Sequence, residues 1–142
     1  MAIFKILFVD DEVSFVNVMN KRLTQREIDV IPAYSGEEAL NKLKDSSVEV
    51  VILDVQMPGI DGIETLKEIK KIYPLVEVIM LTGNATVESA IEGMKLGAFD
   101  YLMKPCDFDL LLKKLTEAAA KKRSHEDKII EAQLRDITIR GR

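Results

Sequence analysis

The sequence is poor in the residues that build disulfide frameworks and histidine metal sites. It has one cysteine, Cys106, and one histidine, His125, in 142 residues. A single cysteine excludes an internal disulfide and suits a reducing cytosol, and a single histidine excludes a metal site made of several histidines. We interpret Cys106 as a small packed residue and His125 as a solvated residue of the polar C-terminal tail.

Long apolar runs are also missing. No run approaches the roughly 18 residues that a membrane-spanning helix needs, and Met1 to Lys5 leads straight into an expected strand, without the pattern of a signal peptide. Hydrophobic residues make up 47% of the chain, which is ample for one core in a chain of one domain's length. We therefore expect a soluble cytoplasmic protein with no membrane contact.

Positive charge is scarce in the first 120 residues. They carry 13 lysines and arginines against 20 aspartates and glutamates, whereas residues 121–142 carry 7 against 4. The first part thus lacks a general basic surface for nucleic acid, and the basic tail is too short to form a DNA-reading module. We expect no direct binding of nucleic acid.

What the sequence does have is a regular alternation of two apolar periods. Short continuous apolar runs, typical of strands buried on both faces, alternate with segments in which apolar residues recur at helical spacing. The expected strands are Ile6–Val9, Val30–Tyr34, Val50–Leu53, Val78–Leu81 and 101–103. The helical stripes include Phe15, Val16, Met19 and Leu23; Ala39, Leu40 and Leu43; Ile63, Leu66, Ile69 and Tyr73; Val87, Ala90, Ile91 and Met94; and Phe108, Leu111, Leu112, Leu115 and Ala119.

Local signals support this division and set the fold class. Pro32 places the second strand at a sheet edge, Ser35 and Glu38 form a capping box that opens a helix, and Gly97 closes another helix. Strands that alternate with helices favour parallel pairing through right-handed crossovers. We predict an α/β, flavodoxin-like, doubly wound fold: a five-stranded parallel sheet in the order 2-1-3-4-5 with five helices.

Four strand ends deliver polar residues to the carboxyl edge of that sheet. Asp10 and Asp11 follow the first strand, Asp54 follows the third, Thr82 follows the fourth, and Lys104 follows the fifth. Clustered carboxylates repel one another without a cation, and Mg²⁺ prefers oxygen ligands, so the three aspartates favour a Mg²⁺ site. A carboxylate can also accept a phosphoryl group, whose charge the metal, Lys104 and Thr82 would offset.

Four motifs around these residues give the chain a family resemblance. They are Val9-Asp10-Asp11-Glu12, Leu53-Asp54-Val55-Gln56-Met57-Pro58-Gly59, Leu81-Thr82-Gly83 and Tyr101-Leu102-Met103-Lys104-Pro105. In this order and spacing, over residues 3 to about 120, the chain resembles the receiver domain of bacterial two-component response regulators. The segment from Gly83 to Pro105 looks most like the receivers of enhancer-binding transcription activators.

The resemblance implies a role for the acidic residues. Asp54 would accept a phosphoryl group from a histidine of a sensor histidine kinase. Mg²⁺ would be held by Asp10, Asp11 and Asp54 together with the backbone carbonyl of Gln56. Glu12 is interpreted from the residues alone as a support of this acidic cluster.

The same resemblance implies roles for three further residues. Lys104 would be the cationic partner of the phosphate, and Thr82 and Tyr101 would form a conformational pair. Without the family pattern, propensity favours Tyr101 as a half-buried strand aromatic and Asp61 as a turn residue. The lifetime of the phosphate stays open, because the family varies at the positions of Gln56 and Asn84.

Two other functions fit parts of the pattern. A phosphohydrolase of the haloacid dehalogenase-like class also uses an aspartyl nucleophile, but it needs a second aspartate two residues later, where this chain has Gln56. A degenerate receiver that serves only as a scaffold is disfavoured by the intact acidic cluster, Thr82 and Lys104. We expect a signalling domain rather than an enzyme, which changes its surface for a downstream protein partner. A homodimer would use the last helix or the face near Tyr101.

The C-terminal tail separates from the rest of the chain by composition. We predict a receiver domain over residues 1–120 and a basic helical extension of the last helix over residues 121–142. Ile130, Leu134 and Ile137 form a short apolar stripe in the tail. The tail is either a frayed solvated helix, because a short isolated helix is marginal in water, or a continuation of the last helix to about Ile137 that pairs with a partner or another copy.

Overall fold

The computed structural model describes residues 4–55, 57, 61–83 and 86–140. Within these residues the strands are β1 (Phe4–Val9), β2 (Ile28–Ala33), β3 (Val50–Leu53), β4 (Glu77–Thr82) and β5 (Asp100–Met103). The helices in the same residues are α1 (Val13–Thr24), α2 (Gly36–Asp45), α3 (Gly62–Ile72), α4 (Val87–Lys95) and α5 (Phe108–Arg140). Every expected strand and helix is present.

The strands form one parallel sheet in the order β2-β1-β3-β4-β5, which confirms the predicted topology. Pro32 lies in β2, the edge strand of the sheet. Because proline has no backbone N–H, it is tolerated at an edge, where the hydrogen bonds between the inner strands do not depend on it. β3 is central and all its residues are buried. Val9 lies opposite Leu53, so the residues that follow β1 and β3 leave the sheet side by side.

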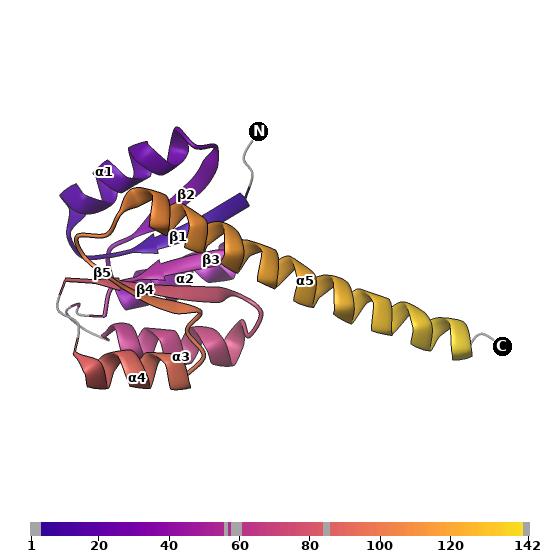
Figure 1. The fold of residues 1–142 in the computed structure, drawn as a ribbon. Coiled ribbons are helices and arrows are strands. Elements are labelled where there is room, and N and C mark those ends of the chain that lie inside the picture. The colour runs from indigo at the N-terminus through magenta and orange to yellow at the C-terminus, as the bar shows by residue number, and fades with distance from the viewer. Residues whose placement is uncertain (1–3, 56, 58–60, 84–85, 141–142) are drawn as a thin grey trace.

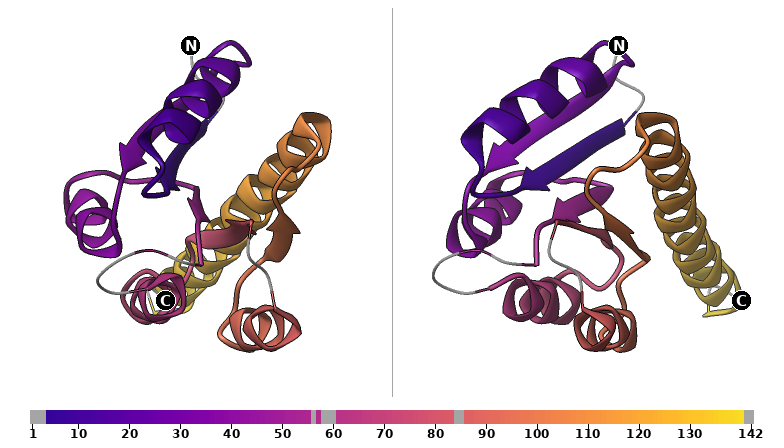
Figure 2. Two further views of the ribbon diagram at one scale, coloured as in Figure 1. Left: turned by 90° about the vertical axis from the view of Figure 1, so that its left-hand side faces the viewer. Right: turned by 60° about the vertical axis from the view of Figure 1, so that its left-hand side comes forward.

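Helices cover both faces of the sheet, with α1 and α5 on one face and α2, α3 and α4 on the other (Figures 1 and 2). Alternate strand residues therefore enter two separate cores. The core under α1 and α5 includes Phe8, Ile52, Ile79, Leu111 and Leu115. The core under α2 and α3 includes Leu7, Val51, Met80, Leu66 and Ile69. Burial on both faces explains why the central strands have continuous apolar runs.

The helix start predicted at Ser35 and the helix end predicted at Gly97 are confirmed, but the second bond of the capping box is made to the N–H of Tyr34 and not to that of Ser35. Oγ of Ser35 accepts a hydrogen bond of 3.1 Å from the backbone N–H of Glu38, and the Glu38 carboxylate accepts one of 3.2 Å from the N–H of Tyr34. Gly97 follows α4 with a φ of 101°, a conformation that glycine adopts without a steric penalty. Its N–H donates to the carbonyl of Met94 at 3.1 Å.

Helix α4 presents most of its apolar stripe to solvent. Val87 is 77% exposed, Ile91 50% and Met94 47%. Gly93 is the only buried residue of α4, and a Cβ there would lie 2.5 Å from Sδ of Met80. The helix thus approaches the sheet closely through a glycine, while its apolar side chains form an exposed face.

Helix α5 crosses the sheet from its carboxyl edge and continues far beyond its amino edge (Figure 1). Its first three turns pack on the sheet through a stripe of buried residues, namely Phe108, Leu111, Leu115, Ala118 and Ala119. The second half projects into solvent: every residue from Asp127 to Thr138 is exposed, whereas Lys122 is still buried against the domain. In the described part of the chain no helix is long and apolar enough to cross a membrane.

Candidate functional site

The backbone around Asp10 and Asp54 is fixed by the sheet. The N–H of Asp54 donates to the carbonyl of Val9 at 3.0 Å, and the N–H of Asp10 donates to the carbonyl of Ala33 at 3.1 Å. Asp10 is 1% exposed and Asp54 is 6% exposed, whereas Asp11 is exposed. Two nearly buried carboxylates therefore stand at the junction of β1 and β3, which is the predicted switch point.

Gly62 brings α3 against the backbone that carries Asp54. Its N–H donates to the carbonyl of Val55 at 2.8 Å, and a Cβ at this position would overlap the backbone of Asp54 and Val55. Asp61 caps the same helix, since its carboxylate accepts a hydrogen bond of 2.9 Å from the N–H of Glu64. The Asp-Gly pair therefore sets both the start of α3 and the position of Asp54.

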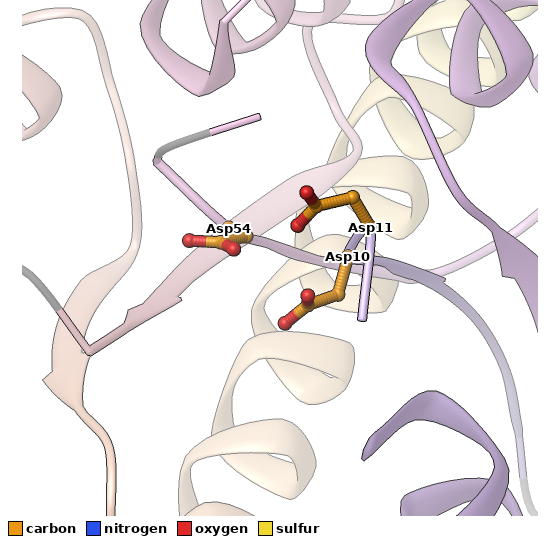
Figure 3. Close-up of side chains that lie close together, drawn as sticks. All are labelled: Asp10, Asp11 and Asp54. Atoms are coloured by element: carbon orange, nitrogen blue, oxygen red, sulfur yellow. The ribbon is translucent and has the colours of Figure 1, made fainter. Parts of the chain in front are cut away.

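Figure 3 shows the carboxylates of Asp10, Asp11 and Asp54 converging. One oxygen of each lies within 4.8 Å of the others. Ligand atoms about 2.1 Å from a Mg²⁺ ion lie about 3 to 4 Å from one another, so small side-chain rotations would bring these three oxygens to ligand spacing. The donor set is thus of the type that suits Mg²⁺, and its oxygens lie close to the spacing that the ion requires. Gln56, whose carbonyl was expected as a further ligand, lies outside the described residues.

The ammonium of Lys104 lies among these carboxylates. Its Nζ is 2.6 Å from Oδ2 of Asp10, 3.7 Å from Glu12 and 3.9 Å from Asp54. Burial opposes the charge on this ammonium, but the hydrogen bond to Asp10 and the charges of Asp10, Asp54 and Glu12 together raise the pKa of Lys104 above its ordinary value. Lys104 is therefore cationic at neutral pH. Its backbone N–H donates to the carbonyl of Thr82 at 2.8 Å, which fixes the main chain of this residue beside the end of β4.

An aromatic ring completes the surroundings of Lys104. Nζ lies 4.3 Å from the ring centroid of Phe15, on α1. The Phe15 ring meets Phe8 edge to face, with centroids 5.8 Å apart at 63°. From the sequence, Phe15 is only a member of a helical stripe. The helical period does not predict that its ring contacts Lys104, which follows β5.

The two residues of the expected conformational pair lie on neighbouring strands, β4 and β5. Thr82 ends β4 and is 1% exposed. Tyr101 is half-buried in β5, and its hydroxyl lies 3.1 Å from Oγ of Ser89. Ser89 belongs to the first turn of α4, where it also forms a reciprocal cap with Thr86. Tyr101 thus joins β5 to α4, a contact that sequence reasoning did not predict.

The structure brings together most of the residues expected at the site. Asp10, Asp11, Asp54 and Lys104 meet at one edge of the sheet, with Thr82 at the end of the neighbouring strand. Glu12 adds a second contact to this group, because its N–H donates to Oδ1 of Asp10 at 2.9 Å. A cluster of carboxylates with one ammonium among them can bind a divalent metal and a phosphoryl group.

Comparisons with known proteins identify relatives of this chain. The family model described as the response regulator receiver domain matches residues 6–116. Transcriptional regulatory protein ZraR of Salmonella typhimurium is 43% identical over 115 residues, which make up 81% of this chain and 26% of the relative. ZraR of Klebsiella oxytoca is 40% identical over 126 residues, or 89% of this chain and 28% of the relative. The chain thus spans about a quarter of the length of these relatives.

Solved structures share the fold over most of the chain. A CheY-like response regulator receiver domain protein of Methanospirillum hungatei has a TM-score of 0.83 at 27% identity, covering 87% of this chain and 99% of that one. NtrX of Brucella abortus has a TM-score of 0.82 at 30% identity, covering 89% of this chain and 29% of that one. The ZraR and NtrX relatives confirm the resemblance predicted from Gly83 to Pro105. The chain therefore belongs to the receiver domain family of two-component response regulators.

Proposed function

We propose that Asp54 accepts a phosphoryl group from a phosphorylated histidine of a sensor kinase, in a reaction that requires Mg²⁺. The observation that carries this proposal is the position of Asp54: nearly buried at the end of the central strand, beside two more carboxylates and 3.9 Å from the Lys104 ammonium. A carboxylate held in this way is an acceptor with the Lys104 cation already near it.

The transfer forms one bond and breaks another. A carboxylate oxygen of Asp54 attacks phosphorus, the phosphorus–nitrogen bond of the phosphohistidine breaks, and the imidazole leaves with the electron pair of that bond. Lys104 and the Thr82 hydroxyl would offset the charge on the phosphoryl oxygens. Mg²⁺, held by Asp10, Asp11, Asp54 and the backbone carbonyl of Gln56, would supply further positive charge there.

The acyl phosphate would then change the surface near Tyr101. A phosphoryl group adds up to about −2 charge and strong acceptor oxygens beside Thr82, which can draw the hydroxyl toward it. Tyr101 would leave Ser89 and turn inward, which remodels the exposed face of α4 with its Val87 and Ile91 side chains. This face would bind a downstream protein or a second copy.

Intact mass after incubation with acetyl phosphate and Mg²⁺ tests the acceptor. Wild type should gain one phosphoryl group, Asp54→Asn should gain none, and Asp107→Asn, a matched loss of charge at an exposed loop, should behave as wild type. Chelation of Mg²⁺ should abolish the gain. If Asp54→Asn gained as much phosphoryl mass as wild type, the acceptor would be a different residue.

A turnover assay separates this function from a phosphohydrolase. Gln56 cannot shuttle a proton as the second aspartate of the haloacid dehalogenase-like class does. We therefore expect no repeated hydrolysis of small phosphoesters beyond the stoichiometric labelling of Asp54. Many turnovers per chain would favour the enzyme.

A further inference from the structure

We propose that Phe15 is a positioning residue for phosphorylation of Asp54 and that it acts through the Lys104 ammonium. The inference rests on the proposed function, and the experiment below separates the two. The face of an aromatic ring attracts a cation placed over it. Nζ of Lys104 lies 4.3 Å from the ring centroid of Phe15, which is within the distance of about 6 Å over which this attraction acts.

The ring is itself held in place by the core. Phe15 packs against Phe8 edge to face, and Phe8 is 1% exposed in β1, between β2 and β3. Phe15 also joins the core cluster under α1 and α5, although it remains half-buried. A ring fixed by the core gives the cation a fixed surface rather than a mobile one.

Lys104 needs such a surface because its own side chain does not fix the ammonium. Lysine has a long flexible stem, and holding it in one rotamer costs conformational entropy. Carboxylates attract Nζ most strongly toward Asp10, at 2.6 Å, and less toward Asp54, at 3.9 Å. The side chain is only 15% exposed, and the Phe15 ring provides part of its enclosure.

The consequence for the reaction follows from where charge develops. The phosphoryl group arrives at Asp54, so an ammonium already held near Asp54 contributes without reorganising. Without the ring, Nζ gains freedom to follow the exposed carboxylate of Glu12 toward solvent, since that oxygen lies 3.7 Å away and Glu12 is 64% exposed. Phe15 thus keeps Lys104 inside the site, where it can meet the phosphoryl oxygens.

The experiment compares rate constants of phosphorylation by acetyl phosphate at saturating Mg²⁺. Phe15→Leu, which keeps apolar volume but removes the ring face, should lower the rate constant about threefold to tenfold. Phe15→Tyr keeps the ring and should restore it. Met19→Ala loosens the same helix one turn further from the site and should leave the rate within about twofold of wild type.

A double-mutant cycle separates a general structural effect of Phe15 from an effect that acts through Lys104. In the Lys104→Met background, Phe15→Leu should cause no further loss, whereas an equal additional loss would overturn the proposal. An independent measurement needs no phosphorylation. The ε-methylene protons of Lys104 should show an upfield ring-current shift in wild type and Phe15→Tyr that Phe15→Leu abolishes.

The outcomes distinguish a failure of Asp54 phosphorylation from a failure of the role of Phe15. If wild type takes no phosphoryl group, the proposed function fails and the role of Phe15 fails with it. If wild type is labelled and Phe15→Leu is labelled at the same rate, the proposed function stands and Phe15 has no positioning role. Absence of the ring-current shift on Lys104 in wild type would also overturn the role of Phe15 alone.

Discussion

The two halves of α5 form one continuous helix in two different environments. In the first half, Leu111 and Leu115 are fully buried against the sheet. In the second half, Ile130 is 52% exposed, Leu134 57% and Ile137 65%. Both halves consist of helix-forming residues without glycine or proline. The difference shows that helix-forming residues are enough to extend the helix past the domain, whereas only the first half gains stability from packing against the sheet.

Ion pairs mark the boundary between the two halves. Lys121 lies 3.6 Å from Glu77, and Arg123 lies 3.9 Å from Glu49. Glu77 is 3% exposed, and its Oε2 has no hydrogen-bond partner among the described residues. Two carboxylates at the amino edge of the sheet thus attract cations from the point where α5 leaves the domain (Figure 1). This edge is opposite the carboxyl edge, where Asp10 and Asp54 follow β1 and β3.

The largest expected effect comes from truncating a leucine in the packed half. Leu115→Ala should lower the free energy of unfolding by about 2 to 5 kcal/mol, because it removes buried methyl groups and leaves a cavity. The same substitution at Leu134 should change it by less than about 0.5 kcal/mol, because that side chain is more than half exposed. Urea unfolding of both variants measures the contrast. Equal losses would mean that the two halves do not differ in packing.

A smaller effect is expected at the boundary. Lys121→Met should lower the free energy of unfolding by about 1 kcal/mol, since it leaves the buried Glu77 carboxylate without its nearest cation, while the exposure of Lys121 screens part of the loss. Lys128→Met, in the exposed half, is the matched control and should have no measurable effect. Thermal melts of the two variants give the comparison, and a melt of Lys121→Met that coincides with wild type contradicts the expected role of this pair.

Sequence reasoning located the strands and the acidic cluster because their patterns are local. Buried strands are continuous apolar runs, and Asp10, Asp11 and Asp54 directly follow two of them. Once the strand order is inferred, their convergence follows from topology. Lys104 follows a fifth run in the same way.

Contacts between distant elements could not be predicted in that way. Phe15 meets Lys104, and Tyr101 meets Ser89, only because α1 and α4 pack at particular angles that periodicity does not encode. The exposed face of α4 has the same origin. Its apolar period predicted a helix, but the close approach of Gly93 to Met80 decides which side faces the sheet.

The apolar stripe of the projecting half should support weak self-association. Ile130, Leu134 and Ile137 offer fewer than two heptads of contact, so we expect dissociation constants of about 0.1 to 1 mM. Leu134→Glu should abolish the association, and Glu131→Gln, nearby on the same exposed segment, should retain it. Sedimentation velocity over a concentration series measures this. A wild-type chain that stays monomeric at millimolar concentration, with and without a phosphate mimic, would leave only a different protein as the partner of this stripe.

The smallest effect is expected when the projecting half is removed and the chemistry of Asp54 is measured. A chain that ends at Asp127 keeps Lys121 and Arg123, and therefore the ion pairs with Glu77 and Glu49 that hold α5 at the amino edge. Asp54, the proposed acceptor, lies at the opposite edge, so the rate constant of its phosphorylation by acetyl phosphate should stay within about twofold of the full chain. The Leu115→Ala variant, measured beside it, should be labelled more slowly as its unfolded fraction grows. If shortening at Asp127 changes the rate as much as Leu115→Ala does, the projecting half is coupled to the site, and the two halves of α5 act as one unit.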